Sequence, residues 1–112
     1  MIQKQDLYEI ITTYSDEKLN EYLKAINHTD LLNQDEQGNI MLHQLINSEL
    51  YYEVSFLLKR NYIERELKQQ MIKTPNNYGD TALHLAVKKQ NTDLVNLLLS
   101  FLTGMNLQNY VN

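Results

Sequence analysis

The stretch NNYGDTALHLAVKKQNTDLVNLLL, residues 76–99, decides the fold because it predicts a tight turn followed by two helices. Gly79 can adopt the positive φ that ends a tight turn. Two residues later, the hydroxyl of Thr81 can accept a hydrogen bond from an N–H of the first helical turn. Three apolar residues then recur at the i, i+3 and i+4 spacing of one helix face, and they are Leu83, Ala86 and Val87.

A second helix should follow Asn91 and Thr92, which interrupt the first apolar pattern. The carboxylate of Asp93 can cap this helix through the first-turn amides. Its expected buried residues are Leu94, Val95, Leu97, Leu98 and Leu99. Isolated helices shorter than about 12–15 residues are marginal in water, so this helix pair needs neighbours of the same kind.

The same pattern occurs earlier in the chain at a constant distance of 41 residues. This distance separates Gly38 from Gly79 and His43 from His84. It also holds in the second helices, where Val54 and Leu58 correspond to Val95 and Leu99. A constant distance through both helices predicts a repeated two-helix unit.

The segment Gly79-Asp80-Thr81-Ala82-Leu83-His84-Leu85-Ala86, followed by Asp93-Leu94-Val95 and Leu97-Leu98-Leu99, resembles an ankyrin repeat. Ala82 stands where that family usually has proline. Within the family, this third unit is most similar to the repeats of the inhibitor-of-NF-kappa-B (I-kappa-B) proteins. The resemblance implies an all-α fold, a short ankyrin-repeat solenoid of about three helix-turn-helix units.

The resemblance also implies roles for the motif residues. In the family, the histidine of the motif hydrogen-bonds the backbone at the turn between repeats, and we expect this of both His43 and His84, in like surroundings. The structural motif residues are Gly38, Leu42, His43, Gly79, Thr81, Leu83, His84 and Ala86.

We expect residues 1–112 to form a single domain. Repeat 1 spans about 6–34 as a degenerate cap, repeat 2 about 35–75, repeat 3 about 76–105, and a C-terminal stub covers 106–112. The family period is about 33 residues, so the 41-residue unit needs an insertion, which we place near 59–75. Within it Ile63, Leu67 and Met71 form a helical stripe, which predicts an extra helix over 61–73 or an extension of the preceding helix.

The C-terminal segment has two alternative interpretations. Gly104 and the three residues after it resemble the linker that opens a fourth repeat. The apolar residues of this segment either fold back over the last helix pair or form a patch that a partner or a second copy of the chain buries. They are Phe101, Leu102, Met105, Leu107, Tyr110 and Val111.

Composition and motifs exclude several classes of function. A net charge of −4 argues against nucleic-acid binding through a basic face. The chain lacks cysteine, an apolar run of about 18 residues and a signal-peptide pattern, which favours a cytoplasmic or nuclear protein. No catalytic residue, cofactor-binding residue or metal ligand is expected, because the sequence has neither a nucleotide-binding nor a hydrolase motif.

We therefore expect a non-catalytic protein–protein interaction module that binds its partner through a concave face and the turn tips. The resemblance assigns the partner-binding positions to Glu36, Gln37, Asn39, Gln44, Asn47, Asn77, Tyr78, Asp80, Leu85 and Lys88. One alternative is a minimal inhibitor of NF-kappa-B/Rel-type transcription factors, such as a pathogen's mimic in a host–pathogen interaction. The other is a complex subunit or self-associating protein, a homodimer through the C-terminal apolar end.

Overall fold

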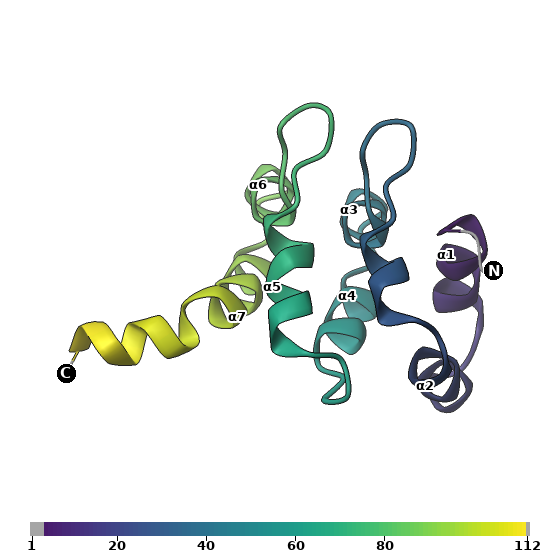
Figure 1. Ribbon diagram of the computed structural model, residues 1–112. Coiled ribbons are helices and arrows are strands. Elements are labelled where there is room, and N and C mark those ends of the chain that lie inside the picture. Colours follow the sequence, from purple (N-terminus) through teal and green to yellow (C-terminus); the bar gives the residue numbers. More distant parts are fainter. Residues whose placement is uncertain (1–3, 112) are drawn as a thin grey trace.

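The computed structural model describes the backbone of residues 4–111 and the side chains of residues 8–102. This part of the chain contains helices and turns but no strand, which confirms the all-α expectation (Figure 1). The helices are α1 (Lys4–Thr13), α2 (Asp16–Ala25), the 3-10 helix η1 (His28–Leu32), α3 (Met41–Asn47), α4 (Tyr51–Leu58), α5 (Arg65–Lys73), α6 (Ala82–Lys88) and α7 (Thr92–Val111). No helix in the described residues combines the length and apolarity that a bilayer span requires.

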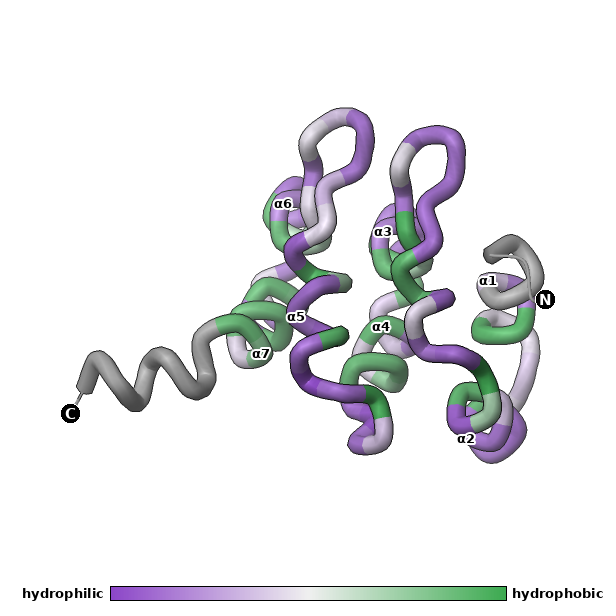
Figure 2. The backbone as a smooth tube through the Cα atoms, viewed as in Figure 1, coloured by the Kyte–Doolittle hydropathy of each residue, from purple (hydrophilic) through white to green (hydrophobic). Residues whose placement is uncertain are grey.

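The helices form three successive units, α1–α2, α3–α4 and α6–α7 (Figure 1). Helix α3 lies in the middle and packs against both α1 and α6. Two long hairpin-shaped turns, residues 33–40 and 74–81, project side by side from the helices (Figure 1). In Figure 2 these turns are mainly hydrophilic, whereas the apolar segments lie within the helices.

Helix α3 is buried on nearly every side because a neighbouring unit covers each of its flanks. Leu42, Leu45 and Ile46 each have 0% exposed surface. A seven-residue helix has few internal hydrogen bonds, and helices of this length depend on tertiary packing for their stability. The stability of α3 therefore comes from both neighbouring units.

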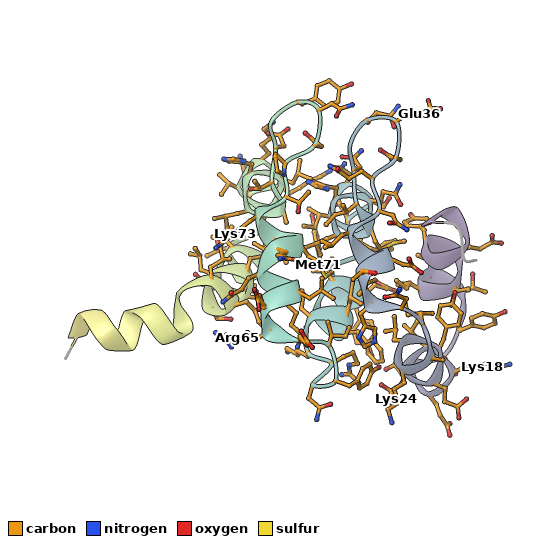
Figure 3. The ribbon with its side chains drawn as sticks, in the orientation of Figure 1. Lys18, Lys24, Glu36, Arg65, Met71 and Lys73 are labelled. Carbon is orange, nitrogen blue, oxygen red and sulfur yellow. The ribbon has the colours of Figure 1, made fainter. Side chains whose placement is uncertain are left out.

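The insertion forms a separate helix, α5. Ile63, Leu67 and Met71 are all buried in the apolar core, as their spacing predicts. The helix begins at Arg65 and not at residue 61, so Ile63 lies in the turn before it. Figure 3 labels Met71 on α5. In the first unit η1 occupies the corresponding place, because a 41-residue shift carries His28–Leu32 onto residues 69–73. Both helices lead directly into a hairpin, so α5 is a longer form of an element that the first unit also has.

The C-terminal segment differs from its expected course. Helix α7 continues through Gly104 to Val111, so the expected linker to a fourth repeat is wrong. Phe101 and Leu102, at the start of this segment, are partly buried against the apolar core. A glycine inside a helix costs only about 1 kcal/mol, which a 20-residue helix tolerates. The side chains of Met105, Leu107, Tyr110 and Val111 lie outside the described residues.

Helix α5 is joined to α7 by hydrogen bonds to the backbone of Ser100 and Phe101. The side-chain amide of Gln69 donates to the carbonyl of Phe101 at 2.9 Å, and Arg65 donates to the carbonyl of Ser100 at 3.2 Å.

The N-terminal cap of α7 differs from expectation. The side-chain oxygen of Asn91, not that of Asp93, accepts the first-turn amide of Leu94 at 3.0 Å.

The predicted apolar face of α6 is wrong at one position. Ala86 is buried and Leu83 is half-buried, but Val87 is 58% exposed. Its counterpart one unit earlier, Ile46, is fully buried because α6 packs against α3. Within the described residues no helix packs against α6 in the corresponding way, so Val87 faces solvent.

Replacing Leu98 by alanine tests the assignment of the core. Leu98 is fully buried in α7, so Leu98→Ala should lower the free energy of unfolding by about 2–5 kcal/mol. Val87→Ala is the matched control, because truncating an exposed side chain should change stability by less than about 0.5 kcal/mol. Urea unfolding of both variants provides the measurement. Similar losses from the two substitutions would mean that the helix faces are misassigned.

Candidate functional site

Each hairpin is closed by an Asp or Asn side chain at the same position. In the first hairpin, Oδ1 of Asp35 accepts the backbone N–H groups of Gln37 and Asn39, both at 2.9 Å. In the second hairpin, Oδ1 of Asn76 accepts the two equivalent amides at 2.9 and 3.0 Å. These bonds hold both tips in one conformation. The sequence signal is an Asp or Asn three residues before each glycine, which the partner-binding prediction did not use.

Four hydrogen bonds join the two hairpins to each other. At their base, the side-chain amide of Gln34 donates to the carbonyl of Pro75 at 3.2 Å. The backbone N–H of Asn77 donates to the carbonyl of Gln37 at 2.8 Å, and its side-chain amide donates to the carbonyl of Glu36 at 2.8 Å. The side-chain amide of Asn76 donates to Oδ1 of Asn39 at 3.0 Å. The tips therefore form one continuous surface, on which Figure 3 shows Glu36 at the end of the first hairpin.

The first motif histidine connects its helix to the hairpin of the following unit. Nδ1 of His43 accepts the N–H of Ile40 at 3.0 Å, so the ring proton is on Nε2, which donates to the carbonyl of Asp80 at 2.9 Å. His43 has no exposed surface. This is the contact with the inter-repeat turn that the sequence analysis expects.

The second motif histidine makes only half of these contacts. Nδ1 of His84 accepts the N–H of Thr81 at 3.0 Å, and the hydroxyl of Thr81 caps the helix. The expectation of like surroundings is wrong, because His84 is exposed. No hairpin follows it in the described part of the chain, so its Nε2 has no counterpart of the Asp80 carbonyl.

In the second and third units, a side chain of the first helix, α3 or α6, reaches the hairpin that precedes it. We call α3 and α6 the inner helices. The amide of Gln44 in α3 donates to Oδ2 of Asp35 at 3.0 Å. In the third unit, Nζ of Lys88 lies 2.9 and 2.8 Å from the two carboxylate oxygens of Asp80. The Lys88 side chain is 63% exposed, so this ion pair contributes at most about 1 kcal/mol to stability. Its main effect is to hold Lys88 beside the hairpin.

Nine of the ten predicted partner-binding residues are exposed or half-buried. The exposed ones are Glu36, Gln37, Asn47, Asn77, Tyr78 and Lys88, and the half-buried ones are Asn39, Gln44 and Asp80. The prediction is wrong for Leu85, which is only 7% exposed. Leu85 belongs to the apolar core, whereas its polar counterpart Gln44 bonds to the hairpin.

The side chains whose pKa values are shifted from their ordinary values lie outside the hairpins. Burial between α5 and α7 lowers the pKa of Lys68, and the positive charges of Arg65 and Arg60 lower it further. Nζ of Lys68 lies 5.4 Å from the ring centroid of Phe101, where a cation–π contact partly compensates for the lost hydration. The described residues contain no cluster of histidine and carboxylate groups that could hold a metal ion. The hairpin surface thus offers hydrogen-bonding groups and one aromatic ring for binding.

Comparison with known proteins gives one match. The family model for ankyrin repeats in three copies matches residues 10–109. Neither the curated proteins nor the solved structures contain a significant match to the chain.

The two turn glycines allow a matched test of the contact between hairpins. Gly38 and Gly79 have φ angles of 78° and 81°, so alanine at either position should cost about 1–2 kcal/mol in backbone strain. A Cβ at Gly38 would also lie 2.7 Å from the backbone nitrogen of Asn77, whereas a Cβ at Gly79 would meet nothing within 4 Å. Urea unfolding should therefore show a loss for Gly38→Ala that exceeds the loss for Gly79→Ala by at least about 1 kcal/mol. Equal losses would contradict close packing of the hairpins.

Proposed function

Since three ankyrin repeats match nearly the whole chain, the protein belongs to the ankyrin repeat family, and we propose that it binds another protein through its hairpin tips and the inner helices α3 and α6. Ankyrin repeats are generally protein–protein interaction modules without enzymatic activity. The proposed contact residues are Glu36, Gln37, Asn39, Gln44, Asn47, Asn77, Tyr78, Asp80 and Lys88.

The observation that carries this proposal is the exposure of Tyr78 on a rigid turn. Its side chain is 77% exposed at the tip of the second hairpin. Its backbone N–H is fixed by Asn76, and the neighbouring Asn77 is bonded to the first hairpin. An aromatic ring on a rigid backbone loses little conformational entropy on binding, and tyrosine is enriched among the residues that dominate interface energies. Tyr78 is therefore the proposed anchor.

The chemistry around Tyr78 indicates the kind of surface that it fits. Glu36, Gln37 and Asn77 offer polar side chains at the tips, and Lys88 presents a cation below them. A complementary partner would place an apolar or aromatic pocket over Tyr78 and surround it with hydrogen-bonding groups. The lysine would favour a carboxylate on the partner opposite α6.

Two narrower proposals concern the identity of the partner. A Rel-type transcription factor is supported by the similarity of the third unit to I-kappa-B repeats, and this partner would place the chain in the cytoplasm or nucleus of a host cell. Self-association through the C-terminal apolar end is supported by the partial exposure of Phe101 and Leu102. The hairpin-tip proposal is independent of both, because its residues are assigned by their exposure and by the contacts between the hairpins.

Replacing Tyr78 and Lys88 together by alanine tests the proposed surface. Both side chains are largely exposed, so the variant should unfold at nearly the wild-type urea concentration. Its affinity for a partner captured with the wild-type chain from the native source should fall at least about tenfold, as expected when an interface anchor is removed. Tyr14→Ala is the control, because Tyr14 is 47% exposed at the end of α1, far from the tips in the sequence. Unchanged affinity of the Tyr78 and Lys88 variant would exclude this surface.

A further inference from the structure

The side of the third unit that faces away from α3 forms a surface that we call the end face, made of Asn77, Gly79, Leu83, His84 and Val87. Val87 is 58% exposed, and His84 is exposed as well. Gly79 has no atom within 4 Å of the position that a Cβ would occupy. The end face therefore combines an apolar helix flank with an uncovered turn.

The corresponding face of the second unit shows what such a surface binds. Leu42 and Ile46, the counterparts of Leu83 and Val87, are fully buried. The third unit contributes to this burial, because α3 packs against α6. At the turn, Gly38 lies so close to Asn77 that a Cβ would approach its side-chain oxygen to 2.5 Å. Within this chain, the corresponding face of the second unit thus packs against a hairpin and the helix that follows it.

The hydrogen bonds at the occupied face define the chemistry of its occupant. The carbonyls of Glu36 and Gln37 accept the side-chain amide and the backbone N–H of Asn77. The equivalent carbonyls on the end face belong to Asn77 and Tyr78, and no described residue donates to them. An occupant of the end face would need an amide side chain and a free N–H at its hairpin tip, with a carbonyl for Nε2 of His84.

The segment that follows the third unit does not supply this occupant. After α4 ends at Leu58, the chain turns and returns through α5 to the next hairpin. At the equivalent point in the third unit, Leu99, the helix does not end, and α7 continues to Val111. A continuous helix over these residues contains neither the turn nor the hairpin that the end face would need.

A second copy of the chain is also a poor fit. Its first hairpin carries Glu36 at the position of Asn77, and a carboxylate cannot donate the hydrogen bond that the amide provides. Helix α1 packs against α3 on the side from which that hairpin would have to approach. Glu9, Thr12 and Thr13 of α1 are exposed and polar, and they would meet the apolar flank of α6.

We propose that the end face binds a hairpin–helix unit of another polypeptide, stacked on α6 as α6 is stacked on α3. The partner carries an asparagine or glutamine at its hairpin tip and an apolar flank on its first helix. This contact shares Asn77 and Tyr78 with the hairpin-tip surface but uses the flank of α6 that faces away from α3, and it extends the array across two chains.

A fluorescently labelled array of consensus ankyrin repeats provides the probe, because consensus repeats fold reliably. Its first repeat has an asparagine-tipped hairpin and no capping repeat before it, and a matched array carries a polar cap at that end. Titration followed by fluorescence anisotropy should show that the wild-type chain binds the uncapped array at least about tenfold more tightly than the capped array. Val87→Glu should weaken this binding at least about tenfold, because it places a charge in the apolar contact.

Asn96→Glu is the control, since it adds the same charge at an exposed position of α7 and should leave binding unchanged. Both variants should keep the urea midpoint of the wild-type chain. The proposal is overturned by an absence of binding, by equal binding to the two arrays, or by equal binding of Val87→Glu and wild type. Sedimentation of the chain alone completes the test, because a dimer that Val87→Glu dissociates would identify a second copy as the occupant.

Discussion

The buried imidazole of His43 is the contact on which the arrangement of the units depends. It accepts an N–H at the start of its own helix and donates to a carbonyl of the next hairpin, so it fixes a local turn and a distant one together. Because the ring has no exposed surface, loss of either partner would leave a buried polar group without a hydrogen bond, which costs about 1–3 kcal/mol. The stacking of the second and third units is therefore specified by polar contacts as well as by apolar burial.

The same set of residues occurs in the third unit without a neighbour to complete it. The third unit repeats the pattern of the second with Leu83, His84 and Val87. Its end face is nevertheless exposed, because no further unit packs against α6 in the described residues. The array is thus polar at one end, where α1 exposes Glu9, Thr12 and Thr13, and competent for stacking at the other. This asymmetry distinguishes the end face from the α1 end of the array, and the hairpin tips form a further surface of their own.

The sequence predicted the features that depend on local spacing. The 41-residue distance identified the repeated unit. The stripe of Ile63, Leu67 and Met71 identified α5, because apolar spacing along a helix is visible in a single segment, but the helix begins at Arg65 and leaves Ile63 in the preceding turn. The burial of Leu85 and the exposure of Val87 were missed because they depend on which neighbour packs against each side of α6. The course of the chain at Gly104 was missed because a glycine both favours a turn and is tolerated within a helix. The bonds between the hairpins join residues about 40 positions apart and leave no local pattern.

The most direct test of the stacking is the exchange of the histidine ring protons, measured by ¹⁵N nuclear magnetic resonance. In the folded chain, the Nε2–H of His43 should be visible and should exchange with solvent only when the hairpins separate, since it donates to the carbonyl of Asp80. The exposed ring of His84 should exchange its proton too quickly to be observed. Rapid exchange at both rings would contradict the account, because it would mean that the second hairpin does not rest on α3.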